Sequence, residues 1–242
     1  MVADLIRHSV KVSMNSGIYR LIQKSLCFIY RGIWPRLNQT NKIVNPYYLL
    51  LLMKYEYQYV SMIQKYINKN EFVVVIGGGD GVSAVAASNQ VQPHGKVQVF
   101  EGGREEVKKT QRMIDVNNFS QIAMVNHTIV SNDYSLRSSA NGAEIISPSD
   151  LPECDTLAID ADGAEFEILK NLENKPQKII IEHHIVPKKQ KNPDVSNIEI
   201  EYEPDKIRSE MQNLGYEIIE EVSEPDRAYG RFEERIFVAE LE

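Results

Sequence analysis

The stretch from Val73 to Gly81 constrains the fold of this chain more than any other, and it reads Val-Val-Val-Ile-Gly-Gly-Gly-Asp-Gly. An apolar, β-branched run without alternation is typical of a parallel strand that is buried on both faces. The residues that follow, from Val82 to Asn89, are predicted to form a helix. The sequence therefore predicts an α/β fold, in which a ligand can approach the bare backbone of a glycine turn between a strand and a helix.

The spacing of the glycines narrows the choice of ligand. The pattern is GxGxG, whereas the dinucleotide fingerprint GxGxxG would need a glycine in place of Val82. The next predicted strand, Lys96 to Phe100, ends in Glu101, and a carboxylate there can accept hydrogen bonds from both hydroxyls of a ribose. We therefore expect a bound nucleoside. Its predicted contacts are Gly77, Gly78, Gly79, Asp80, Gly81 and Glu101.

Two further predicted strands end in titratable side chains. Residues 154–159 form a predicted strand that runs into an acidic turn and a helix, and three carboxylates crowd its end: Asp160, Asp162 and Glu165. The second strand, residues 178–181, leads into Glu182, His183 and His184. Because ligands bind beyond the carboxyl ends of parallel strands, we expect both groups to face the same edge of the sheet as the glycine turn.

These residues resemble the FkbM-type S-adenosylmethionine-dependent methyltransferases, a group within the Rossmann-like class I methyltransferases. The most specific part runs from Ile159 to Glu165, where this chain has Ile-Asp-Ala-Asp-Gly-Ala-Glu and the family typically has Ile-Asp-Val-Glu-Gly-Ala-Glu. The resemblance covers residues 72–242. Two positions depart from it: the usual acidic residue at the end of the first strand is Val75, and the usual lysine before the Ile-Asp pair is Ala158. The other landmarks are Phe100-Glu101, Val116-Asn117 and Ile181-Glu182-His183.

The resemblance implies a mostly parallel seven-stranded sheet with the strand order 3-2-1-4-5-7-6 and helices on both faces. The last two strands are predicted at Tyr216–Val222 and Arg235–Leu241, after a helix over Asp205–Leu214. Earlier in the chain, periodicity predicts a helix over Glu105–Val116 and a short strand over Ile122–Asn126. Residues 132–141 and 188–197 are predicted to be loops.

The resemblance also implies the chemistry, which is methyl transfer from S-adenosylmethionine to a hydroxyl of a carbohydrate or a secondary metabolite. Asp160 is predicted to steer the acceptor hydroxyl or to take its proton, and also to contact the cofactor; capping the following helix is its alternative role. His183 is the second candidate for proton transfer, because imidazole exchanges protons near neutral pH, although a structural role is open as well. The adenine is expected near residues 127–129, with Ile129 as the predicted contact.

Three alternative interpretations are open at this point. The acidic strand end is also similar to that of the divalent-metal methyltransferases of the catechol type. The possible ligands of magnesium or manganese are then Asp160, Asp162, Glu182 and His183. The departures at Val75 and Ala158 allow a non-catalytic nucleoside-binding or scaffold module. An NAD-dependent Rossmann oxidoreductase is the third alternative, which Val82 disfavours.

Charge divides the chain near residue 70. Residues 1–70 hold 10 Lys or Arg against 2 Asp or Glu, a net charge of +8, whereas residues 71–242 hold 17 against 32, a net charge of −15. Eight of the 12 tyrosines also precede residue 70. We therefore predict a basic, Tyr-rich helical extension over residues 1–70 and an S-adenosylmethionine-binding domain over residues 71–242.

The extension is predicted to contain two helices. Apolar residues recur at helical spacing between Ile18 and Ile29, and a second helix is expected from a cap at Asn45 to about Ile67. These helices are expected to pack on protein, which includes a second copy of the chain, or to lie on an anionic membrane surface. The apolar run over residues 47–53 is far shorter than the roughly 20 residues that cross a bilayer.

The basic residues are spread over apolar helices and the remaining domain is acidic, so we expect no nucleic-acid partner. The family resemblance implies a small-molecule or glycan acceptor. A cytoplasmic protein is expected, because Asp4 and Arg7 interrupt the apolar core that a secretory signal needs. Cys27 and Cys154 are the two cysteines, which argues against a disulfide framework or a zinc cluster.

Overall fold

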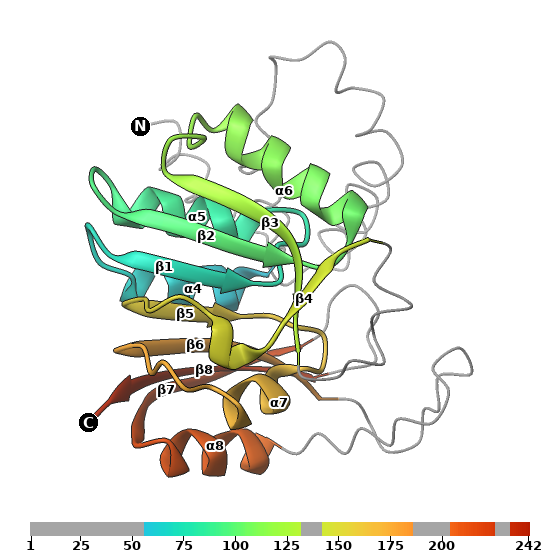
Figure 1. Cartoon of the computed structure of the whole chain (residues 1–242). Coiled ribbons are helices and arrows are strands. Elements are labelled where there is room, and N and C mark those ends of the chain that lie inside the picture. The colour runs from blue at the N-terminus through green and yellow to red at the C-terminus, as the bar shows by residue number, and fades with distance from the viewer. Residues whose placement is uncertain (1–55, 132–141, 186–203, 226–232) are drawn as a thin grey trace, which may run out of the picture. The chain divides into compact units, whose positions relative to one another are not determined.

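In the part of the chain that the structure describes, eight strands pair into one sheet in the order β4-β3-β2-β1-β5-β6-β8-β7 (Figure 1). The computed structural model describes residues 56–131, 142–185, 204–225 and 233–242, which belong to a unit that begins at Glu56. Neighbouring strands are parallel except for the pairs β6–β8 and β8–β7. The strands are β1 (Phe72–Ile76), β2 (Lys96–Glu101), β3 (Ala123–Val130), β4 (Glu144–Ile146), β5 (Thr156–Ile159), β6 (Lys178–Ile185), β7 (Tyr216–Pro225) and β8 (Glu233–Leu241).

The predicted α/β fold is confirmed, with a difference in the number of strands. Seven strands follow the predicted order, and β4 adds an eighth at the edge, parallel to β3. β4 pairs with Thr128, Ile129 and Val130, which lie beyond the predicted end of β3 at Asn126. The prediction missed β4 because three residues carry too little periodicity to indicate a strand.

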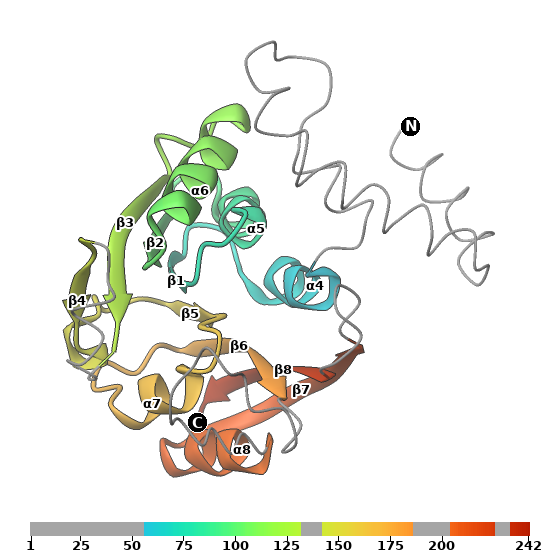
Figure 2. The same cartoon turned by 90° about the vertical axis from the view of Figure 1, so that its right-hand side faces the viewer.

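Helices cover both faces of this sheet (Figure 2). One face carries α4 (Tyr57–Tyr66), α5 (Val82–Val91) and α6 (Arg104–Val116), and the other carries α7 (Glu165–Lys170) and α8 (Pro204–Asn213). α5 is buried along nearly its whole length, which fits its position between β1, β2, α4 and α6. α6 is amphipathic, since Thr110, Met113 and Ile114 are buried while charged residues line its exposed side.

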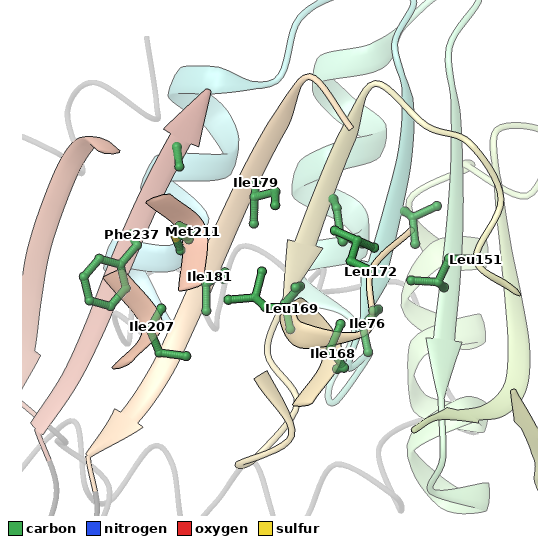
Figure 3. Close-up of a cluster of buried hydrophobic side chains, with 14 of the residues drawn as sticks. Ile76, Leu151, Ile168, Leu169, Leu172, Ile179, Ile181, Ile207, Met211 and Phe237 are labelled. Carbon is green, nitrogen blue, oxygen red and sulfur yellow. The ribbon is translucent and has the colours of Figure 1, made fainter. Parts of the chain in front are cut away.

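A cluster of buried hydrophobic side chains lies between the sheet and the pair α7 and α8 (Figure 3). Alternate residues of β6, Ile179 and Ile181, face this group, and Ile168 and Leu169 of α7 pack against them. Each such side chain contributes about 1.5–3 kcal/mol when it leaves water. The packing fixes the distance between α7 and the end of β6, where predicted site residues lie.

Helix α4 precedes the predicted domain boundary at residue 70 and packs on the sheet unit. Its buried residues contact α5 and β6. The helix begins at Tyr57, because Glu56 has a left-handed backbone with φ of 47°. The prediction of one continuous helix from Asn45 to Ile67 is therefore wrong at Glu56. The division at residue 70 stays a prediction, and the amphipathic helix expected over residues 18–29 lies outside the described residues.

The loops expected over residues 132–141 and 188–197 also lie outside the described residues. Among the helices that the structure describes, none is long and apolar enough to span a bilayer.

A buried ion pair ties the end of α4 to the sheet. Lys178 Nζ, at the start of β6, donates to Glu71 Oε1 (2.9 Å) and to the carbonyl oxygen of Tyr66 (2.7 Å), and Thr156 Oγ1 donates to Glu71 Oε2 (2.8 Å). Burial opposes ionisation of Glu71, but hydrogen bonds from Lys178, Asn68 and Thr156 outweigh it and hold the pKa of this carboxyl below its usual value. Glu71 therefore stabilises the fold at neutral pH, and this contribution is lost as the pH falls through the lowered pKa.

We predict that Lys178→Met lowers the free energy of unfolding by about 3 kcal/mol, because it leaves a buried carboxylate without its cation. Urea denaturation at pH 7 measures the change. The matched control is Lys108→Met, since Lys108 makes an exposed pair with Glu105 and its loss should cost much less. Equal losses in the two variants would contradict a structural role for the Lys178 pair.

Candidate functional site

The glycine turn after β1 is closed on one side and open on the other. Gly77 has a φ of +89°, and a Cβ at this position would lie 1.8 Å from the carbonyl oxygen of Asp160. Gly81, with a φ of +85°, precedes α5 and donates its N–H to the oxygen of Gly78 (2.7 Å). A Cβ on Gly79 would meet no atom of the described residues within 4 Å. A ligand can therefore reach the backbone of the turn at Gly79.

Glu101, at the end of β2, binds this turn directly. Its Oε2 accepts hydrogen bonds from the N–H groups of Gly78 (2.7 Å) and Gly79 (3.0 Å), and its Oε1 accepts one from Gly103 (2.6 Å). A carboxylate has about four acceptor positions, so roughly one is left for a ligand hydroxyl. The residue predicted to bind two ribose hydroxyls thus also holds the glycine turn in shape.

Helix α6 supports the turn from the side. Thr110 is buried, and its Oγ1 donates to the oxygen of Gly79 (3.2 Å). Lys109 Nζ lies 3.6 Å from Asp80 Oδ1, so Asp80 faces α6. Thr110 was not predicted as a site residue, because a single threonine in an amphipathic helix carries no signal that separates it from the core.

Ile129 of β3 lies next to the Glu101 end of the site. A Cβ on Gly102 would lie 2.6 Å from Ile129 Cγ1, and His127 Nε2 lies 3.1 Å from the oxygen of Gly102. The structure therefore brings the apolar residue predicted to contact adenine beside the carboxylate predicted to bind ribose. The contacts with a ligand stay predictions.

Asp160 follows β5 and lies next to the glycine turn. Its N–H donates to the oxygen of Ile76 (2.9 Å), and its own carbonyl oxygen is the atom that excludes a side chain at Gly77. The side chain is half-buried. Burial raises the pKa of Asp160 well above its usual value, and the neighbouring carboxylates Asp162 and Glu165 add to this rise. A raised pKa makes the ionised carboxylate a stronger base, which suits a group that takes a proton.

The other two carboxylates of this strand end have different environments. Asp162 is exposed and has a left-handed backbone with φ of 46°. Glu165 is fully buried, and its Oε1 accepts hydrogen bonds from the N–H groups of Gly163 (2.9 Å) and Ala161 (3.2 Å). Glu165 therefore braces the acidic turn from inside the protein. The sequence did not indicate this role, because it could not tell a buried carboxylate from an exposed one.

His183 lies on the Glu165 side of the sheet. It is fully buried, and its Nδ1 is 3.7 Å from Glu165 Oε2. Successive residues of a strand point to opposite faces, so Glu182 points away from His183. The predicted cluster at the end of β6 is thus divided between the two faces. The side chain of His184 lies outside the described residues.

A metal centre finds no support in this arrangement. Within the described ranges, no group of three or more His, Cys, Asp or Glu side chains could hold a metal ion. Asp162 is exposed, His183 is buried, and Glu182 points to the opposite face from His183. The four ligands suggested for magnesium or manganese are therefore not brought together.

Comparison with known families decides the identity. The sequence profile described as "Methyltransferase FkbM domain" matches residues 36–218, which is most of the chain. The chain belongs to the FkbM methyltransferase family. As a member of this family it is an S-adenosylmethionine-dependent methyltransferase, which confirms the resemblance found in the sequence and sets aside the NAD-dependent oxidoreductase. The matched region starts before residue 70 and includes α4.

Solved structures with the same fold are distant in sequence. A proposed sarcosine dimethylglycine methyltransferase from Galdieria sulphuraria is 10% identical with a TM-score of 0.57, over 89% of this chain and 97% of that chain. A proposed RNA methyltransferase from Pyrococcus horikoshii is 12% identical with a TM-score of 0.50, over 76% of this chain and 81% of that chain. A search of the curated proteins finds no match. Since one of these structures is described as acting on RNA, the expected absence of a nucleic-acid partner has no support from the fold.

An added methyl group should have different effects at Gly79 and at Gly77 of the glycine turn in this FkbM domain. Gly79→Ala should cost about 1–2 kcal/mol of stability, through its positive φ alone, and should weaken S-adenosylhomocysteine at least tenfold by filling the open space. Gly77→Ala should cost about 3 kcal/mol or more, because its Cβ meets the backbone of Asp160. Thermal denaturation and calorimetric titration measure the two effects. A Gly79→Ala variant with unchanged affinity would place the ligand elsewhere.

Proposed function

We propose that this protein transfers a methyl group from S-adenosylmethionine to a hydroxyl of a carbohydrate or a secondary metabolite. The proposal depends on one observation, which is that three features meet at the same edge of the sheet. These are the open backbone at Gly79, the Glu101 carboxylate with room for one more donor, and the half-buried Asp160 beside Gly77. The family resemblance supports the class of acceptor.

The residues at this edge fit the cofactor by the chemistry of their groups. Glu101 suits a ribose hydroxyl, since it is an acceptor with a remaining position, and Ile129 offers an apolar surface beside it for the adenine. The open side of Gly79 lies between Glu101 and Asp160 along the order β2-β1-β5. A cofactor that spans these strands would bring its amino-acid end towards Asp160.

Asp160 is proposed to act on the acceptor. When bound, S-adenosylmethionine supplies a methyl sulfonium that is already a strong electrophile, so the protein has to orient the acceptor oxygen and remove its proton. Asp160 is half-buried at the strand exit and has a raised pKa, so it can hold an acceptor hydroxyl and take its proton as the bond to the methyl group forms.

His183 suits a supporting role better than direct proton transfer. It is fully buried and faces Glu165, whose other oxygen holds the turn that carries Asp160. A catalytic role for His183 stays a prediction. If the residue supports the turn, His183→Gln should lower stability and turnover together and leave the pH dependence of the rate unchanged.

The acceptor class is tested with methyl-labelled S-adenosylmethionine and three panels: hydroxylated sugars and glycans, phenolic and alcoholic metabolites, and RNA. Alkali-stable label in a sugar or metabolite hydroxyl is the expected result. Label in RNA or in an amine would contradict the proposed acceptor. Cofactor that binds without consumption in all three panels would contradict it as well.

The proposed ribose contact predicts a loss of cofactor affinity in Glu101→Ala of about 1.5–3 kcal/mol, because a charge-assisted hydrogen bond is removed. The same variant should also be less stable, since three backbone N–H groups lose their acceptor. Calorimetric titration with S-adenosylhomocysteine measures the affinity. Lower stability with unchanged affinity would mean that Glu101 serves the turn alone.

The proposed base predicts that Asp160→Asn abolishes methyl transfer while cofactor affinity stays within about tenfold of the parent protein. The same substitution should also change the stability of the protein without cofactor, and the direction of this change follows from the raised pKa. The Asp160 carboxyl is protonated more readily in the folded state, so its contribution to stability is present at low pH and is lost as the pH rises through the raised pKa. Asn cannot ionise, so the variant should gain stability over the parent as the pH rises.

Two measurements check this pair of effects. Single-turnover rates with an accepted hydroxyl test the base, and thermal denaturation from pH 4 to pH 8 tests the charge. Parental turnover in Asp160→Asn would remove the residue from the reaction. A stability difference that does not grow with pH would instead contradict the raised pKa.

A further inference from the structure

Thr110 of α6 uses its hydroxyl outside its own helix. A threonine within a helix commonly donates to the carbonyl oxygen one turn back in the same helix. Thr110 Oγ1 donates instead to the carbonyl oxygen of Gly79 in the glycine turn (3.2 Å), and the side chain is buried. The bond therefore joins α6 to the one position of the turn that a ligand can reach from the open side.

Two other glycines of the turn let α6 come close enough for this bond. α5 and α6 lie side by side on one face of the sheet (Figure 2). A Cβ on Gly78 would lie 2.7 Å from Thr110 Oγ1, and a Cβ on Gly81 would lie 2.7 Å from the Cβ of Met113. A side chain at either glycine would push α6 away from the turn. The absence of side chains at these two positions thus serves the contact with Thr110.

The hydrogen bond fixes the peptide group between Gly79 and Asp80. This peptide is trans, and a trans peptide points its C=O and its N–H in opposite directions. Because the Gly79 oxygen faces Thr110, the Asp80 N–H points away from α6. Among the described residues this N–H has no acceptor, whereas the Asp80 carboxylate faces Lys109 of α6 (3.6 Å). The main chain of Asp80, and not its side chain, is therefore the part that points away from α6.

Glu101 does not hold this peptide group. Its carboxylate accepts from the N–H groups of Gly78 and Gly79, which belong to the two preceding peptide groups. The peptide before Asp80 starts at a glycine, whose backbone has many conformations available. Without the Thr110 hydroxyl this peptide is free to turn over, and it would then present a carbonyl oxygen where it now presents a donor.

We propose that Thr110 is a positioning residue of the cofactor site. By binding the Gly79 oxygen, it keeps the Asp80 N–H turned towards the cofactor as a hydrogen-bond donor, and it does not touch the cofactor itself. This inference rests on the cofactor placement of the proposed function, at the open side of Gly79. It makes α6 a part of the cofactor site.

Thr110→Val tests this role, because valine keeps the branched shape of threonine and removes the hydroxyl. If the peptide then has the right orientation in only about a tenth of the molecules, S-adenosylhomocysteine should bind about tenfold more weakly. Thr110→Ser keeps the hydroxyl and should bind this ligand almost as tightly as the parent does. Calorimetric titration of the three proteins measures the difference.

Thr156→Val is the matched control. Thr156 is also buried and donates its hydroxyl to Glu71 (2.8 Å), at the start of β5, whereas Asp160 and the site follow the end of that strand. The same substitution there should lower the melting temperature at least as much as Thr110→Val does. Its affinity for S-adenosylhomocysteine should stay within about twofold of the parent, because distant positions couple weakly.

A second measurement uses the parent protein and does not depend on the folding of a variant. In ¹⁵N-labelled protein, S-adenosylhomocysteine should move the amide proton resonance of Asp80 downfield, because the N–H gains an acceptor. A purely structural role of Thr110 would give no such shift.

Three results would overturn the inference: unchanged affinity in Thr110→Val, an equal loss of affinity in Thr156→Val, or an Asp80 amide resonance that does not respond to the ligand. In each of these cases, a weakened Glu101→Ala would leave the proposed function standing. If the parent does not bind S-adenosylhomocysteine, the proposed placement of the cofactor fails and the inference fails with it.

Discussion

The contact between Glu101 and the glycine turn is the interaction on which the site depends. A backbone with three consecutive glycines has many conformations available and would lose much entropy on ordering. One carboxylate from the neighbouring strand selects a single conformation by accepting from Gly78, Gly79 and Gly103. Because the carboxylate is charged, these hydrogen bonds are stronger than those between neutral groups. β1 and β2 therefore place the turn and the predicted ribose contact as one unit.

The neighbouring strands β1 and β5 continue this arrangement. The Asp160 carbonyl oxygen occupies the space beside Gly77, and the Asp160 N–H is bound to Ile76. The acidic turn is in turn held by the buried Glu165, next to His183. The site is thus supported by three sets of contacts between β2 and β6: those of Glu101, of the Asp160 backbone and of Glu165. Most of the hydrogen bonds in these sets join a carboxylate to the backbone. Side chains that interact with the backbone in this way leave little freedom for the site to shift as a ligand binds.

The sequence predicted the parts of this molecule that depend on local patterns. The buried strand before Gly77, the helix after it and Glu101 at the next strand end were all visible as short motifs. The sequence could not indicate that Glu101 binds the turn itself, because that contact depends on the pairing of two strands. Burial was also hidden, since Asp162 and Glu165 have the same chemistry and only one of them lies inside the protein. Tyr59 was grouped with the basic extension on composition, whereas α4 packs against the sheet unit.

The inward orientation of Glu165 has a consequence for how such a protein can diversify. Glu165 holds the acidic turn from inside the protein, by the N–H groups of Ala161 and Gly163 on either side of Asp162. Asp162 is exposed there, on a residue whose backbone conformation suits Asn and Gly as well as Asp. We propose that an exchange at this outer position can change the preference for an acceptor while Asp160, the proposed base, keeps its place.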